Sequence, residues 1–275
     1  MAFYRSRGLD LHYEVAGAGP AVLLVHGFTN FAFVWAPQIA ALAYSGYRVI
    51  VPDLAGHGLS APVNEDTGVA TLAGDMVALL DVLGIDRAAV CGLSLGGMVA
   101  QQMAVDHPRR VAAMVVADSR ADNNGMQPAV ERWIAEFEGP GGPQGRLAKT
   151  YPLLLNDAFR ASASGQATFD LWRLVLSQVA GQSLASIARG MLGFDITAGL
   201  PAVDTPTLVI SGEQDLLIPP ALSRRSAELI RGARFEVIPG AGHISSLDSA
   251  AAFNQLLLTF LADPAVASRM ANPAG

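Results

Sequence analysis

The sequence is poor in cysteine, lysine and long apolar stretches. Cys91 is its single cysteine and Lys149 its single lysine among 275 residues. One cysteine excludes an intrachain disulfide and fits a reducing compartment, so we expect a cytoplasmic protein. The N-terminal residues lack the apolar run of a signal sequence, and no segment approaches the ~18 consecutive apolar residues of a transmembrane helix. These absences argue against a membrane partner but leave open whether a leader has been removed.

Several cofactor-binding patterns are also absent. There is no G-x-x-x-x-G-K-[ST] phosphate-binding loop, and no cysteine–histidine cluster has zinc-ligand spacing. The glycine-rich turn at residues 17–20 precedes an apolar run, whereas a dinucleotide-binding fingerprint follows a strand. The net charge of −6 argues against nucleic acid as the main partner. We therefore expect neither a metal nor an organic cofactor, and no nucleic-acid partner.

Short apolar runs alternate with segments of helical periodicity through much of the chain. This alternation is typical of an α/β protein with a mostly parallel sheet and helices on both faces. A length of 275 residues with 51% hydrophobic composition suits one large domain, or one domain with an insertion. The expected strands are residues 9–15, 21–25, 47–51, 88–91, 111–117, 207–211 and 234–238.

A gap of roughly ninety residues separates the strand at 111–117 from the next one. This gap is too long for an ordinary connection, and apolar spacing within it predicts helices near 128–137 and 169–179. We therefore expect a core domain of residues 1–119 and 201–275, with a helical cap inserted at 120–200. A closing helix is expected near 250–261, followed by a frayed tail over the last dozen residues.

The motif G-L-S-L-G at residues 92–96 follows an apolar strand and opens a helix. In that context G-x-S-x-G forms a nucleophile elbow, in which a sharp turn exposes the serine at the carboxyl edge of the sheet. The flanking glycines let strand and helix approach closely. We therefore predict Ser94 as a catalytic nucleophile.

A serine hydroxyl needs an adjacent base, and five histidines compete for this role. His12 lies in a predicted strand, where an exposed structural role is expected. His26 and His57 belong to glycine-rich turns, and His107 ends a predicted helix. His243 follows the last predicted strand, in a loop at the same sheet edge as Ser94. We therefore predict that His243 is the general base.

A carboxylate is expected to orient the histidine and stabilise its charged form. Asp215 lies just after the strand at 207–211, at the correct edge of the sheet, and is the predicted acid. Asp118, after the strand at 111–117, and Glu213 remain alternatives. The chain order Ser94, Asp215, His243 differs from the orders of the chymotrypsin and subtilisin types.

Five phrases together resemble the α/β-hydrolase superfamily. They are V-H-G-F at 25–28, P-D-L-A-G-H-G-L-S at 52–60, C-G-L-S-L-G-G-M at 91–98, S-G-E-Q-D at 211–215 and G-A-G-H at 240–243. The likeness runs from about residue 9 to residue 261. It implies the α/β-hydrolase fold and an oxyanion hole made by the backbone N–H groups of Phe28 and Leu95. The phrases at 92–101 and 107–111 most resemble the branch of 3-oxoadipate enol-lactonases and small carboxylesterases.

These observations predict a serine hydrolase that cleaves a carboxylic ester or lactone through an acyl-enzyme on Ser94. Alternatives on the same triad are C–C bond hydrolysis, acyl transfer or perhydrolysis. A ligand receptor without turnover is a further alternative of a different class. Haloalkane dehalogenases and epoxide hydrolases resemble this chain in their overall pattern but have an aspartate as nucleophile. Ser94 at that position argues against both activities. The sequence leaves open whether the chain forms a homo-oligomer.

Overall fold

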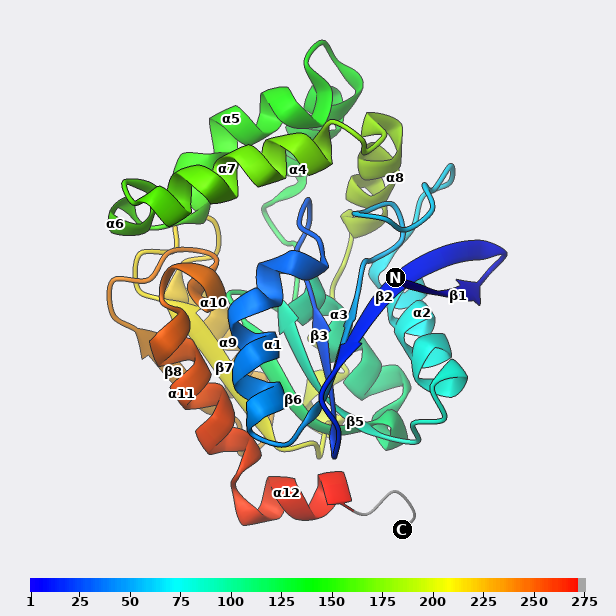
Figure 1. Ribbon diagram of the computed structural model, residues 1–275, viewed down its shortest axis with the longest axis vertical. Coiled ribbons are helices and arrows are strands. Elements are labelled where there is room, and N and C mark those ends of the chain that lie inside the picture. Colours follow the sequence, from blue (N-terminus) through cyan, green and yellow to red (C-terminus); the bar gives the residue numbers. More distant parts are fainter. Residues whose placement is uncertain (272–275) are drawn as a thin grey trace.

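The computed structural model describes residues 1–271 and contains one eight-stranded sheet (Figure 1). The strand order is β1-β2-β4-β3-β5-β6-β7-β8. The two pairs that involve β2 are antiparallel, and all other pairs are parallel. The strands are β1 (Ala2–Ser6), β2 (Leu9–Ala16), β3 (Ala21–Val25), β4 (Arg48–Pro52), β5 (Ala88–Leu93), β6 (Val111–Ala117), β7 (Thr207–Gly212) and β8 (Arg234–Ile238).

Helices cover both faces of the sheet, as the alternation of strands and helices predicts (Figure 1). The helices α1 (Ala36–Tyr44), α11 (Ala250–Leu261) and α12 (Pro264–Ala271) cover one face. The other face carries α2 (Val69–Val82), α3 (Leu95–Asp106) and α9 (Pro220–Leu229). Shorter helical segments are η1 (Ala32–Trp35), η2 (Pro108–Arg110), η3 (Leu200–Ala202) and α10 (Ser245–Asp248).

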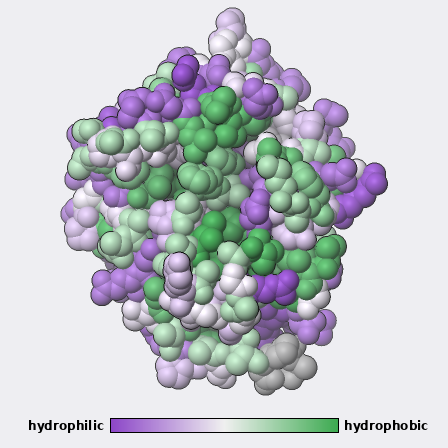
Figure 2. Space-filling view, viewed as in Figure 1, coloured by the Kyte–Doolittle hydropathy of each residue, from purple (hydrophilic) through white to green (hydrophobic). Residues whose placement is uncertain are grey.

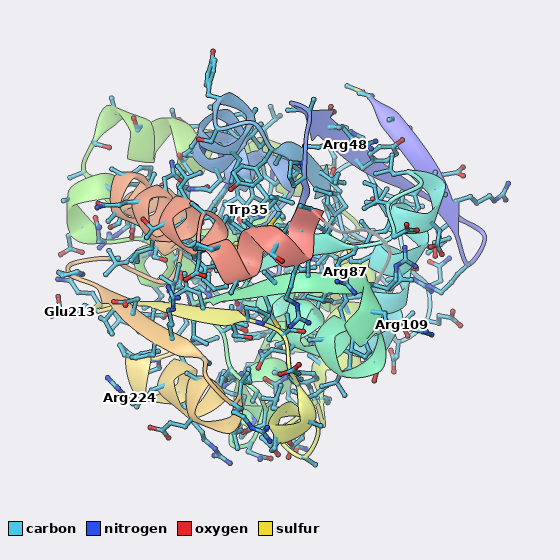
Figure 3. The ribbon with its side chains drawn as sticks, turned by 90° about the horizontal axis from the view of Figure 1, so that it is seen from below. Trp35, Arg48, Arg87, Arg109, Glu213 and Arg224 are labelled. Carbon is cyan, nitrogen blue, oxygen red and sulfur yellow. The ribbon has the colours of Figure 1, made fainter. Side chains whose placement is uncertain are left out.

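The central strands are buried on both faces, which explains their continuously apolar sequences. Every residue of β5, β6 and β7 is buried. On the α1/α11 side, the fully buried Trp35 packs against Phe253 of α11, with ring centroids 6.1 Å apart. Figure 3, which looks from below, shows Trp35 among these helices. The core thus holds the carboxyl ends of β5, β6 and β7 in fixed positions.

Five α-helices lie between β6 and β7 and cover the carboxyl end of the sheet (Figure 1). These inserted helices are α4 (Gln127–Glu138), α5 (Gly142–Leu154), α6 (Asp157–Arg160), α7 (Ala163–Leu176) and α8 (Gly181–Met191). Hydrophobic surface runs from them onto the core in Figure 2. A hollow at this boundary is lined by Phe33 and Leu59 of the core and Val175 of α7. The helices match the expected insertion at 120–200, and its assignment as a separate cap domain stays a prediction.

The structure differs from the sequence-based expectation at both ends of the chain. β1 was not predicted, and it pairs with β2 from Ala2↔Tyr13 to Ser6↔Leu9. The expected frayed tail is wrong up to Ala271, because α12 begins at Pro264 and buries Val266 against the core. Residues 272–275 lie outside the described part of the chain. No single helix within residues 1–271 is long and apolar enough to span a membrane. Only α11 and α12 taken together, with a bend of 70° between them, reach the length and apolar composition of a span within these residues.

Candidate active site

The turn between β5 and α3 holds Ser94 in a strained backbone conformation. Its φ is 52° and its ψ is −113°, a left-handed region that costs a non-glycine residue about 1–3 kcal/mol. Glycines make this turn possible: a Cβ on Gly92 would lie 2.0 Å from the carbonyl oxygen of Gly96, and one on Gly96 would lie 2.0 Å from that of Val25. The local geometry is therefore that of the predicted nucleophile elbow.

A continuous hydrogen-bond chain joins the three predicted catalytic side chains. His243 Nε2 lies 3.1 Å from Ser94 Oγ, and His243 Nδ1 lies 2.8 Å from Asp215 Oδ2. The register of the parallel strands explains why these side chains come together. Leu93 pairs with Ala117 in the sheet, and Ala117 pairs with Ile210. Residues that follow these strands therefore emerge at one edge of the sheet.

Asp215 is held in place by the turn after β7. Its Oδ1 accepts hydrogen bonds from the N–H groups of Leu217 and Ile218, at 2.8 and 2.9 Å. The other oxygen is thereby aimed at His243. Burial lowers the pKa of His243, but the charge of Asp215 and its hydrogen bond raise it, and the net pKa lies above the ordinary imidazole value. The carboxylate therefore strengthens the imidazole as a proton acceptor.

The two alternative acids occupy other positions. Asp118 is fully buried, and it accepts hydrogen bonds from the Gly212 N–H and from the N–H and hydroxyl of Ser245. Burial and the nearby Asp215 carboxylate raise the pKa of Asp118 to about 8. Glu213 Oε2 accepts from the Gly240 N–H, which fits its predicted role in a turn. Neither carboxylate hydrogen-bonds to His243 within the described residues.

The remaining histidines have structural contacts. His26 Nε2 accepts the N–H of Leu54 at 3.0 Å, and His57 lies edge-on to Phe28. The expectation that His12 is exposed is wrong. His12 is only 3% exposed, because it lies between Asp53 and Glu14, at 2.8 and 3.0 Å. A buried imidazole between two carboxylates suits a structural bridge between β2 and the loop after β4.

The predicted oxyanion donors flank Ser94. Leu95 is the first residue of α3, and Phe28 follows Gly27, at which a Cβ would lie 3.2 Å from the Ser94 Cβ. Neither backbone N–H donates to a protein acceptor in the part of the chain that the structure describes. Two free N–H groups beside the serine are suited to bind a negatively charged oxygen. Their assignment as the oxyanion hole stays a prediction.

A narrow pocket of about 60 Å³ leads to Ser94 and His243. Its apolar wall includes Phe28, Trp133, Met98, Met126, Leu154, Met191, Leu217 and Ile218. Two arginines, Arg120 after β6 and Arg146 on α5, also line it. Sequence reasoning missed both, although Arg120 follows a strand at the same edge as Asp118. A larger hollow of about 440 Å³ lies at Arg87 and Arg109 (Figure 3), at the amino ends of β5 and β6 and away from this pocket.

Within residues 1–271, no group of three or more His, Cys, Asp or Glu side chains is arranged to hold a metal ion. Burial raises the pKa of the Cys91 thiol, so this cysteine is not a reactive thiolate. The chemistry available at this edge of the sheet therefore consists of a hydroxyl, an imidazole, carboxylates, two guanidinium groups and backbone N–H groups.

Comparisons with known proteins agree with this geometry. The sequence model of the alpha/beta hydrolase family matches residues 22–256. A Variovorax paradoxus protein that bears the name "Putative carbamate hydrolase RutD" is 34% identical to this chain. The match covers 92% of this chain and 97% of that protein.

Solved structures include similar enzymes. The enol-lactonase of Burkholderia xenovorans LB400 has a TM-score of 0.87 and 28% identity, over 95% of this chain and 100% of its own. An esterase of Thermogutta terrifontis, solved with malate bound, has a TM-score of 0.85 and 30% identity, over 94% and 96%. The expected resemblance to enol-lactonases and esterases is thus confirmed across nearly the whole chain.

Proposed function

This chain is a hydrolase of the α/β-hydrolase family, and we propose that it cleaves a carboxylic ester or a lactone through an acyl intermediate on Ser94. The observation that carries the proposal is the hydrogen-bond chain from Asp215 through His243 to Ser94, at 2.8 and 3.1 Å. A neutral imidazole that accepts from a hydroxyl while a carboxylate holds its other nitrogen is the arrangement that nucleophilic attack requires.

Acylation begins when His243 Nε2 takes the proton of Ser94 as its Oγ attacks the carbonyl carbon. The carbonyl oxygen becomes negative and accepts hydrogen bonds from the N–H groups of Phe28 and Leu95. The tetrahedral intermediate then expels the alkoxide, and the imidazolium of His243 gives it the proton. In a lactone the expelled oxygen stays attached to the acyl group, so ring opening and acylation are one event.

Deacylation repeats these steps with water. His243 takes a proton from a water molecule while the oxygen of that water attacks the acyl carbon. Ser94 Oγ then leaves and receives the proton that the imidazolium returns. Asp215 remains ionised throughout and stabilises the imidazolium in both halves.

Carbamate hydrolysis is a second candidate on the same residues. It is favoured by one observation: four similar relatives, 28–34% identical over at least 92% of this chain, are named for carbamate hydrolysis. A carbamate also presents a carbonyl carbon to Ser94, with a nitrogen or oxygen leaving group. The enol-lactonase and the esterase, at 28% and 30% identity, support the ester and lactone reading.

A panel of short esters, lactones and carbamates, with product identification, separates these reactions. We expect kcat/KM for the preferred substrate to fall by about 10³- to 10⁶-fold in Ser94→Ala, because the acyl intermediate cannot form. Ser177→Ala makes the same chemical change at an exposed position just after α7 and is expected to leave turnover intact. Full esterase turnover in Ser94→Ala would disprove the mechanism.

A further inference from the structure

Arg120 is a buried cation whose donors are only partly used. Its side chain lies just after β6, and the residue is 5% exposed. Nη2 donates to Asn123 Oδ1 at 2.7 Å, whereas the buried Nε has no hydrogen-bond partner within residues 1–271. An unpaired donor on a buried charged group is costly, so such groups in folded proteins usually have a partner. The protein itself leaves this part of the guanidinium without one.

The charge of Arg120 is also left without a direct counter-ion. No carboxylate of the described residues lies within ion-pair distance of its guanidinium. Asp122 pairs instead with Arg225 at 3.7 Å, and Asp215 is occupied by His243. Burial lowers the pKa of Arg120 to about 10, with Asp122 and Asp215 opposing this, so the group is still charged near neutral pH. Arg120 is therefore a buried positive charge for which residues 1–271 provide no ion-pair partner.

Arg120 lines the same pocket as Ser94 and His243. The surrounding wall is mostly apolar, with Met126, Trp133 and Met191 among its residues. In such surroundings a guanidinium interacts more strongly with an anion than it would in water. The planar fork of arginine matches carboxylate and phosphate groups, and of these a carboxylate is the smaller.

The other arginine of the pocket is different. Arg146 Nη1 lies 2.6 Å from Glu136 Oε2, and the guanidinium lies over the Trp133 ring, 4.7 Å from its centroid. Arg146 therefore already has a carboxylate partner, which it shares with Lys149, and its flat face is stacked on an aromatic ring. Of the two cations, Arg120 is the one that has no carboxylate within ion-pair distance among the described residues.

We infer that Arg120 binds a carboxylate carried by the substrate, so that the ester or lactone cleaved at Ser94 is a small anion. The inference rests on the proposed function, because it assigns the substrate class of the same site. The carboxylate would occupy the Arg120 side of the pocket while the scissile carbonyl lies at Ser94.

A matched pair of substrates tests the inference. Ethyl hydrogen glutarate carries a carboxylate, and ethyl glutaramate replaces it by a neutral amide of similar size. We expect wild type to prefer the anion, and we expect Arg120→Met to lower the anion-to-amide ratio of kcat/KM by about 10- to 100-fold, mainly through KM. Arg120→Lys keeps the charge and is expected to retain part of the preference.

Arg225→Met is the matched control, because Arg225 is a nearby cation that does not line the pocket. It is expected to keep the ratio close to that of wild type. An unchanged ratio in Arg120→Met would overturn the inference. Equal losses for both substrates, with normal thermal unfolding, would also overturn it, since they would indicate a structural role.

A binding measurement separates failure of the inference from failure of the proposed function. If wild type cleaves no ester or lactone of the panel, the proposed function fails, and calorimetric titration with glutarate and glutaramide then tests Arg120 alone. Tighter binding of glutarate by Ser94→Ala, lost when Arg120→Met is added, would support the anion site. Equal binding of the two ligands would refute it.

Discussion

The sheet edge and the inserted helices contribute different groups to the same pocket. The sheet edge carries the three proposed catalytic side chains, which hydrogen bonds connect: His243 lies 3.1 Å from Ser94 and 2.8 Å from Asp215. The inserted helices supply mainly apolar wall, including Trp133, Leu154 and Met191. We infer that the sheet edge determines which reaction takes place and that the inserted helices determine which substrate shape the pocket accepts.

The two regions are joined at the loop that carries His243. Asp248 Oδ2 accepts the N–H of Gly242 and that of Asn156, both at 2.8 Å, and the Ile244 N–H donates to the Leu154 carbonyl. On the other side, Ser183 Oγ of α8 accepts the Val63 N–H at 2.9 Å. The inserted helices are therefore fixed to the core by directional contacts at two places, although most of their interface is apolar.

Three substitutions, Asp215→Asn, Gly96→Ala and Gly145→Ala, test the difference between the sheet edge and the inserted helices. Asp215→Asn is expected to have the largest effect. In Asp215→Asn the imidazole loses the carboxylate that orients it and stabilises its charged form. We expect kcat/KM to fall by about 10³- to 10⁴-fold. Asp118→Asn is the matched control: Asp118 has a raised pKa of about 8 and does not hydrogen-bond to His243 within residues 1–271, so a smaller loss is expected. A larger loss in Asp118→Asn would assign the acid to β6.

The pH profile of kcat/KM gives a second test of the same carboxylate. Only neutral His243 accepts the serine proton, and its pKa lies above the ordinary value of 6.5 because Asp215 favours the charged form. Activity is therefore expected to fall as the pH is lowered through a pKa above 6.5. In Asp215→Asn this limb should move to lower pH. An unshifted limb would show that another group sets the protonation of the base.

A glycine at the elbow tests how tightly the sheet edge is packed. A Cβ on Gly96 would lie 2.0 Å from the Val25 carbonyl oxygen and 2.7 Å from that of His26, so backbone must move to admit it. We expect Gly96→Ala to lower the free energy of unfolding by about 1–3 kcal/mol or more, measured by urea denaturation. An unchanged midpoint would mean that β3 and α3 separate easily, contrary to the close approach.

The sheet edge was also the region that the sequence predicted best. The short strands, the glycines around Ser94 and the positions of Asp215 and His243 directly after strands all carry local signals. The parallel order then determines where these residues meet. β1 was missed because its residue types do not follow its burial: Phe3 is exposed, whereas Ser6 is buried, and the strand gains its partner only through β2. α12 was missed for a similar reason, since the burial of Val266 depends on the folded core.

The pocket wall was less predictable. Trp133 was one of several aromatic residues in the gap between β6 and β7, and nothing local distinguishes it from Trp172, which is buried in packing. The significance of Arg120 depends on what is missing around it, namely an acceptor for Nε and a nearby carboxylate. An absence of partners is a property of the assembled fold, so a single sequence gives no sign of it.

The smallest expected effect comes from a glycine of the inserted helices. Gly145 lies within α5, and a Cβ there would meet no atom within 4 Å. Alanine favours a helix more than glycine does, so Gly145→Ala is expected to raise the free energy of unfolding by about 0.5–1 kcal/mol while kcat/KM stays unchanged. Urea denaturation beside Gly96→Ala measures the contrast. Destabilisation by Gly145→Ala would show that the inserted helices tolerate change no better than the sheet edge, and the distinction between the two regions would fail.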